Sequence, residues 1–308
     1  MNKSFFRFAI LLAVAIAAVA AIAFAVAPRS GSSDRTKMAV VGTFYPLAHF
    51  AEQVGGGLVT VANITPSGAE PHDYEPTAQD IEKAYAAKVF VMNGGGVDTW
   101  AERIKPDLKT KGVQVVDMQD TIALSAAPSG SETTLDPHIW LDPVLAEQEV
   151  ALIRDAFVAA DPKHAAAYQK NAAGYIAQLA TLDAEYKTGL ASCRLNDIVT
   201  SHAAFGYLAK RYGLTQVAIS GLSPDAEPSV QQMVAIAQLA KKDGVKYIFF
   251  ETLVSPKLSQ AIASEIGAQT LSFNPLEGLS DAEVGAGKTY LTVMRDNLDK
   301  LRLALDCK

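Results

Sequence analysis

Residues 38–64 read MAVVGTFYPLAHFAEQVGGGLVTVANI, and this stretch decides the fold. A β-branched run at 38–43 and another at 58–64 enclose a helical pattern at 45–55. Two more strand candidates and two helix candidates continue the alternation: 77–86, 88–93, 98–110 and 113–117. Strands that alternate with helices are typical of βαβ units, which build a parallel sheet with right-handed crossovers.

A second set of strands and helices follows Cys193. Its strand candidates are 197–201, 216–220, 247–251 and 270–273, and its helix candidates are 204–212, 229–243, 256–267 and 286–305. Two sets of about four strands predict an α/β chain with two similar lobes.

A long helical pattern lies between the two sets. Apolar residues recur at steps of three and four from Tyr168 to Leu190, Asp161 is suited to cap the helix, and Pro162 suits its first turn. The helix would have about 28 residues and a length of roughly 42 Å. A surface helix of one lobe is the alternative, but length and position favour a rigid connector at 161–190, between lobes at 38–160 and 191–308.

Composition and the amino terminus indicate an exported protein. The 308 residues are 49% hydrophobic, enough to bury a core, and the net charge of -6 argues against a nucleic-acid partner. Lys3 and Arg7 precede an uncharged run from Phe8 to Ala27, so 1–27 is a signal peptide or an uncleaved membrane anchor, followed by a polar linker at 28–37. We expect the protein in the periplasm or at the outer face of the cytoplasmic membrane, with membrane association only through this segment.

Three of the five histidines lie where strands give way to helices. His72 lies in a loop after a strand candidate, His138 lies in DPHIWLDP just ahead of a helical pattern, and His202 ends a strand candidate. Open α/β sheets place their ligand sites at such strand ends, so the three histidines form a candidate metal site. His49 and His164 lie inside or at the start of helical patterns, and we expect structural or surface roles for them.

Three neutral imidazoles need a fourth ligand to complete a tetrahedral zinc site, usually a carboxylate or water. Glu251 and Glu277 end or follow strand candidates, while Glu70 and Asp73 flank His72. The residues alone do not choose among these four acids.

The chain resembles the metal-binding receptors of zinc and manganese ABC importers, from Met38 to Cys307. The motifs that carry the resemblance are FYPLAHFAEQVGG, PSGAEPHDYEPT, MNGGGVDTW, DPHIWLDP, IVTSHAAFGYLAKRYGL, ISGLSPDAEPS, FFETLVSPKL and NPLEGL. The resemblance implies two (β/α)4 lobes with parallel sheets, joined by one long rigid backbone helix, with the metal in the cleft.

The family's ligands fall on His72, His138, His202 and Glu277. Glu251 is then expected to cap the helix that opens near Pro256 or to pair with a lysine. Three nitrogen donors suit Zn²⁺ better than Mn²⁺, which prefers oxygen ligands. The resemblance further implies delivery of the ion to the membrane permease of an ABC importer, and we expect the protein to be a monomer.

The sequence departs from the family in three places. The stretch SAAPSGSETTL at 125–135 has no histidine, so accessory metal capture is not expected there. Some members have an acid immediately before the first histidine, where this chain has Pro71, and this favours Glu277 over Glu70. Many relatives are lipoproteins, but the amino terminus has no cysteine to lipidate.

Cys193 and Cys307 lie at the start and the end of the second lobe. In an oxidising, exported context we expect them to form a disulfide, although free buried thiols are the alternative.

The chain contains no HExxH, GxSxG, P-loop or GxGxxG motif, so we expect no enzyme. A manganese receptor, an exported zinc-dependent hydrolase and an adhesin are the alternatives to zinc delivery.

Overall fold

The structure is a computed structural model that describes residues 37–126 and 135–308. The predicted signal peptide or anchor at 1–27, the linker up to residue 36 and most of the loop at 126–135 lie outside the described residues. In the described part of the chain, no helix is both long and apolar enough to cross a bilayer. The compact unit described below is Met38–Lys308.

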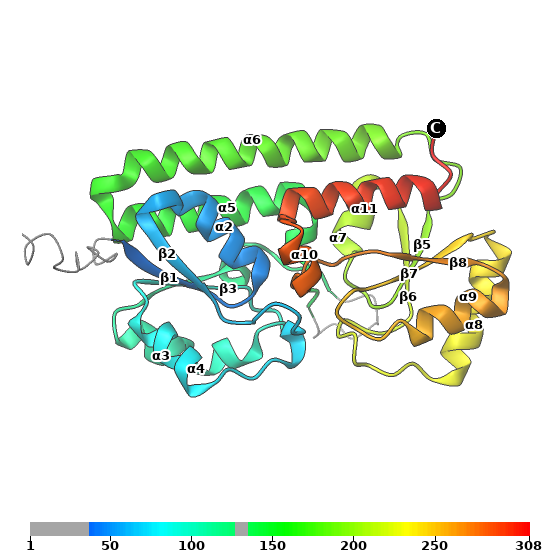
Figure 1. The fold of residues 1–308 in the computed structure, drawn as a ribbon, viewed down its shortest axis with the longest axis horizontal. Helices are drawn as coiled ribbons and strands as arrows, with labels where there is room; N and C mark the ends of the chain where they lie inside the picture. Colours follow the sequence, from blue (N-terminus) through cyan, green and yellow to red (C-terminus); the bar gives the residue numbers. More distant parts are fainter. Residues whose placement is uncertain (1–36, 127–134) are drawn as a thin grey trace, which may run out of the picture. The chain divides into compact units, whose positions relative to one another are not determined.

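The first lobe is a parallel four-stranded sheet with helices on both faces (Figure 1). Its strand order is β2-β1-β3-β4, and β3 is completely buried, as expected for a parallel sheet covered on both sides. Helices α3 and α4 share one apolar cluster with one face, while α2 and α5 pack into the main core on the other. Its elements are β1 (Met38–Gly42), α2 (Tyr45–Gly55), β2 (Val59–Asn63), α3 (Ala78–Ala86), β3 (Val89–Met92), α4 (Thr99–Thr110), β4 (Gln114–Asp117) and α5 (Pro143–Ala160).

The second lobe repeats this architecture with the strand order β6-β5-β7-β8, again fully parallel. Its elements are β5 (Asp197–Thr200), α7 (Gly206–Tyr212), β6 (Thr215–Ala218), α8 (Val230–Lys242), β7 (Tyr247–Phe250), α9 (Lys257–Ile266), β8 (Gln269–Ser272), α10 (Asp281–Gly285) and α11 (Tyr290–Ala304). The predicted fold class is therefore confirmed.

Helix α6 (Ala165–Leu190) runs along both lobes (Figure 1). The Asn171 side chain donates to the carbonyl of Val54 in α2, and the Tyr186 hydroxyl donates to the carbonyl of Met294 in α11. The main apolar core contains residues of α2, α5, α6, α7 and α11, so the two lobes share one core beside this helix. Asp161 does not cap α6: its carboxylate accepts from His164 and Tyr168, and a 3-10 turn at Pro162–His164 precedes the helix.

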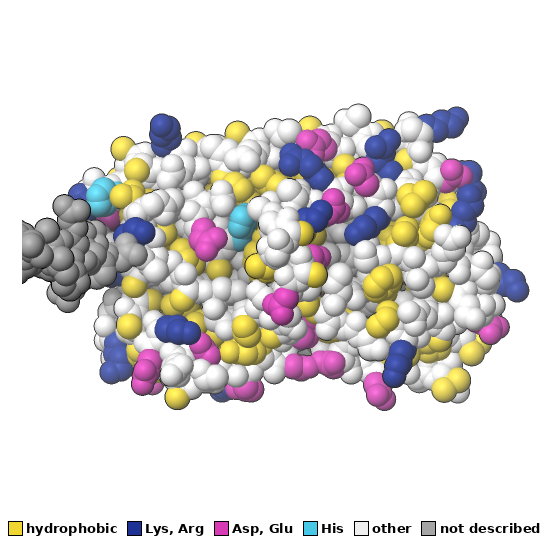
Figure 2. All heavy atoms as spheres, in the orientation of Figure 1, with side chains coloured by type: hydrophobic (Ala, Val, Ile, Leu, Met, Phe, Trp, Pro, Cys, Tyr) yellow, Lys and Arg dark blue, Asp and Glu magenta, His cyan; other side chains and the backbone are white. Residues whose placement is uncertain are grey.

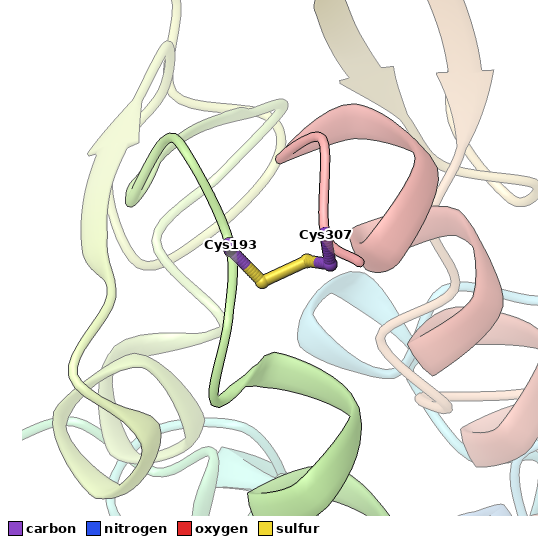
Figure 3. Close-up of a disulfide and its surroundings, with 2 residues drawn as sticks. All are labelled: Cys193 and Cys307. Carbon is purple, nitrogen blue, oxygen red and sulfur yellow. A yellow bond between two sulfur atoms is a disulfide. The ribbon is translucent and has the colours of Figure 1, made fainter.

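A disulfide joins Cys193, just after α6, to Cys307, just after α11 (Figure 3). It ties the end of the long helix to the end of the chain and so closes the second lobe.

Candidate metal centre

Four loops bring the candidate ligands together from both lobes. His72 lies in a 3-10 turn (Pro71–Asp73) between β2 and α3, and His138 lies just before the 3-10 turn η4 (Ile139–Leu141). His202 lies just after β5, and Glu277 lies in the loop after β8. All four residues thus lie in loops that follow the carboxyl ends of strands, where open parallel sheets form their binding sites.

The four side chains converge on one point. The Nε2 atoms of His72 and His138 each lie 3.2 Å from Oε1 of Glu277, and Nε2 of His202 lies 3.1 Å from the same oxygen. Nε2 of His138 and Nε2 of His202 are 3.3 Å apart. The side chains of His138, His202 and Glu277 are completely buried, and that of His72 is 6% exposed.

This arrangement has the dimensions of a tetrahedral metal shell. Zinc binds imidazole nitrogen and carboxylate oxygen at about 2.0–2.2 Å, which places the ligand atoms of a regular tetrahedron about 3.3–3.5 Å apart. The measured separations of 3.1–3.3 Å are close to these values, and no pair of ligand atoms is more than 4.8 Å apart. An ion would therefore need only small shifts of the four side chains.

Two further carboxylates bond to the Nδ1 atoms of the fully buried histidines, His138 and His202, on the side of each ring away from Glu277. Oδ1 of Asp136 lies 2.8 Å from Nδ1 of His138 and also accepts from the His138 backbone N–H. Both oxygens of Glu251 lie 2.8 Å from Nδ1 of His202, and Oε1 accepts from the His202 backbone N–H. A carboxylate on Nδ1 favours the tautomer with the proton there, which leaves the Nε2 lone pair free for a metal.

Burial and the close approach of the carboxylates and imidazoles together shift the pKa values of His202 and Glu277. Burial alone would lower the pKa of His202, but the charges and hydrogen bonds of Glu251 and Glu277 together raise it well above its ordinary value. Burial alone would raise the pKa of Glu277, but the charge of His202 and hydrogen bonds from the three histidines hold it well below its ordinary range. Glu277 is thus an ionised carboxylate at the centre of the cluster, and its Oε2 has no hydrogen-bond partner.

The other three candidate acids, Glu70, Asp73 and Glu251, do not join the four converging side chains. Oε1 of Glu70 accepts from the backbone N–H of His72, and burial together with the charge of Glu277 raises the pKa of Glu70 to about 9. Asp73 is exposed. The expectation that Glu251 caps the helix near Pro256 or pairs with a lysine is wrong, because Glu251 bonds to His202 and α9 has no side-chain cap.

The remaining histidines lie outside the site. His49 is buried in α2, stacked on Tyr45 and edge-on to Tyr175, and burial lowers its pKa to about 4. His164 is partly exposed and pairs with Asp161.

Asp136 is the functional candidate that sequence reasoning missed. Its place two residues before His138, in DPHIW, is the signal that was available.

Comparisons with known proteins agree with this architecture. The high-affinity zinc uptake system protein ZnuA of Bacillus subtilis is 40% identical over 290 residues, which cover 90% of each chain. The zinc-binding protein AdcA of Streptococcus pyogenes is 38% identical over 88% of this chain, and the chain spans only 56% of the length of that relative. The crystal structure of the Zn(II)-bound ZnuA-like domain of Streptococcus pneumoniae AdcA has a TM-score of 0.77 and 40% identity, covering 88% of this chain and 99% of that one.

A family profile described as "ZnuA: Zinc-uptake complex component A periplasmic" matches residues 40–304, almost the whole described chain. The match includes both lobes, the connecting helix and all four converging side chains. The predicted resemblance is therefore confirmed, and the chain belongs to the ZnuA family of periplasmic zinc-uptake components.

Proposed function

We propose that the chain is an extracytoplasmic receptor that captures Zn²⁺ in the cleft between its lobes and delivers it to the permease of an ABC importer. The observation that carries this proposal is the convergence of three imidazole nitrogens on one buried carboxylate oxygen. Family membership and the zinc-binding relatives support it.

His72, His138, His202 and Glu277 are the proposed zinc ligands. Three nitrogen donors and one carboxylate favour Zn²⁺ over Mn²⁺, whose preferred ligands are oxygens. Four protein ligands also fill a tetrahedral shell and leave no position for a reactive water, so we propose binding and transport rather than catalysis.

Release to the permease is helped by the division of the ligands between the lobes. His72 and His138 come from the first lobe, and His202 and Glu277 come from the second, so a relative movement of the lobes breaks the shell. The core that both lobes share beside α6 restricts this movement. We therefore expect small tilts and loop shifts rather than a wide opening.

The protein acts outside the cytoplasm as a monomer in this proposal. Residues 1–27 would direct export or hold the protein at the membrane, and 28–37 would be a linker to the first lobe. Basic and acidic side chains are interspersed on the face drawn in Figure 2, which fits a protein with no nucleic-acid partner.

Metal analysis of the purified protein tests the proposal. After equilibration with equal concentrations of Zn²⁺ and Mn²⁺, elemental analysis should find one zinc per chain and little manganese. Structural zinc sites have apparent binding free energies of about 10–16 kcal/mol. Loss of one of four ligands should therefore cost about a quarter of this, about 3 kcal/mol, or roughly 100-fold in affinity. His72→Ala, His138→Ala and His202→Ala should each show this loss in a chelator competition.

His164→Ala is the matched control, because this histidine is partly exposed and bonds to Asp161. It should bind zinc as the wild type does. Preference for manganese, or wild-type zinc affinity in any of the three cleft variants, would contradict the proposal or remove that histidine from the site.

A further inference from the structure

Trp140 is a fully buried residue beside the proposed metal site. It lies in η4, two residues after His138. Its indole packs against the His138 imidazole with ring centroids 5.2 Å apart, and it meets Phe44 edge-on at 4.8 Å. The ring therefore supports one proposed ligand from within the first lobe.

The indole N–H and the backbone carbonyl of Trp140 both bond to the second lobe. Its Nε1–H donates to the carbonyl oxygen of Pro275 at 2.8 Å, and its own carbonyl oxygen accepts from the Tyr290 hydroxyl at 2.5 Å. Pro275 stands two residues before Glu277, and Tyr290 is the first residue of α11. One residue of the first lobe thus makes two buried hydrogen bonds across the lobe boundary.

The turn that presents Glu277 has an uncommon backbone conformation. Leu276 has a φ of 57°, in the left-handed region that non-glycine residues adopt only where their surroundings hold them. Its N–H donates to Oδ1 of Asn274 at 2.7 Å, while the Trp140 indole holds the carbonyl of Pro275 immediately before it. The turn is therefore fixed from its own lobe and from the opposite one.

We propose that Trp140 is a positioning residue for the metal site. Its ring sets the plane of His138, and its N–H holds the turn that aims Glu277 at the histidines. The relative placement of two ligands from different lobes then depends on one side chain that does not contact the ion. This inference rests on the proposed function, because it assumes that the four converging groups bind zinc.

The first test is Trp140→Phe, which keeps an aromatic ring beside His138 but removes the donor to Pro275. Partners that orient metal ligands commonly contribute 10- to 100-fold to affinity, so we expect zinc affinity to fall at least about 10-fold. Release of zinc to excess chelator should become faster by a similar factor. The matched control is Trp100→Phe, which makes the same change in the separate core around Phe90 and should leave both quantities unchanged.

Cobalt(II) absorption separates positioning from general packing. The visible bands of bound Co²⁺ report ligand geometry, so Trp140→Phe should change their position or intensity, and Trp100→Phe should not. Wild-type affinity, release rate and spectrum in Trp140→Phe would overturn the inference, as would equal losses in the two variants. A wild-type protein that binds no zinc would instead overturn the proposed function, and this inference with it.

A second pair of variants applies if Trp140→Phe does not fold. Tyr290→Phe removes the second of the two bonds that Trp140 makes across the lobe boundary, and Tyr186→Phe removes a similar buried bond, to Met294 at 2.7 Å, that does not involve Trp140. Tyr290→Phe should release zinc several-fold faster than Tyr186→Phe. Equal release rates in these two variants would overturn the inference.

Discussion

Glu251 and Glu277 both follow strands of the second sheet, yet they meet opposite nitrogens of the same imidazole, His202. Glu277 lies at Nε2, among the other histidines, whereas Glu251 lies at Nδ1 and also accepts from the His202 backbone N–H. Position along the strand predicts that each acid reaches the cleft. Which nitrogen it reaches depends on the loop that follows the strand, and the sequence does not reveal that geometry.

We expect Glu277→Gln to weaken zinc binding more than Glu251→Gln. The first change removes the charge of a proposed ligand, which should cost about 3 kcal/mol of binding free energy. The second leaves an amide oxygen that still accepts from Nδ1–H, so its cost should be nearer about 1 kcal/mol, rather than the near-zero effect expected for a helix cap. Chelator competition on both variants checks the order, and a larger loss in Glu251→Gln would make Glu251 the fourth ligand.

At the scale of the element, α5 has an acid in the stripe that faces the core. Glu149 is fully buried between Ala146 and Ile153 on the inner face of the helix, and neither of its oxygens has a hydrogen-bond partner. The sequence predicts a helical pattern here without bounds, and Glu149 is a carboxylate within its apolar stripe. The charge of Asp142 contributes to raising the pKa of Glu149, and the charge of Glu149 contributes to raising the pKa of Tyr290 in α11.

We expect Glu149→Met to stabilise the metal-free protein at neutral pH. Burial, with a smaller effect of Asp142, raises the pKa of Glu149 well above its ordinary value of 4.5. Above about pH 4.5 the unfolded chain therefore releases a proton that the folded protein keeps, so the contribution of Glu149 to stability falls as the pH rises towards the folded-state pKa. Removal of the acid should add about 1–3 kcal/mol to the free energy of unfolding at pH 7.5, and less at pH 4.5.

Urea unfolding of chelated protein at the two pH values measures this gain. Gln148→Met puts the same side chain on the exposed neighbouring position and should change stability by less than about 0.5 kcal/mol. A loss of stability in Glu149→Met at pH 7.5 would mean that the carboxylate has a favourable role in the core.

At the scale of the whole molecule, local patterns predict the architecture and the convergence of the histidines, but not the contacts between the lobes. The eight strands lie within one or two residues of their predicted positions, although only β3 is buried at every residue and the edge strands β6 and β8 are partly exposed. The convergence of His72, His138 and His202 is predictable because each lies in a loop that follows a strand. The sequence does not predict helix α10 or the bonds of Trp140, since one is a short capped turn and the others depend on how the two lobes pack against each other.

Closure of the second lobe by its disulfide should affect stability without affecting the metal site. The bond joins residues 114 apart, and the chain-entropy model gives about 4–5 kcal/mol for a loop of roughly this length, although measured losses are often nearer 2 kcal/mol. Cys193→Ser combined with Cys307→Ser should therefore lower the free energy of unfolding by about 2–5 kcal/mol. Zinc affinity should stay within about threefold of the wild type, because the bond lies beyond the ends of α6 and α11 and none of the four proposed ligands belongs to that region (Figure 1).

The wild type in reducing agent should match the double variant in urea unfolding, and the reductant should not change the stability of the double variant. If reduction leaves the wild type as stable as before, the disulfide contributes nothing to the fold, and hydrogen bonds such as that from Arg194 N–H to the carbonyl of Leu305 already hold the chain end in place.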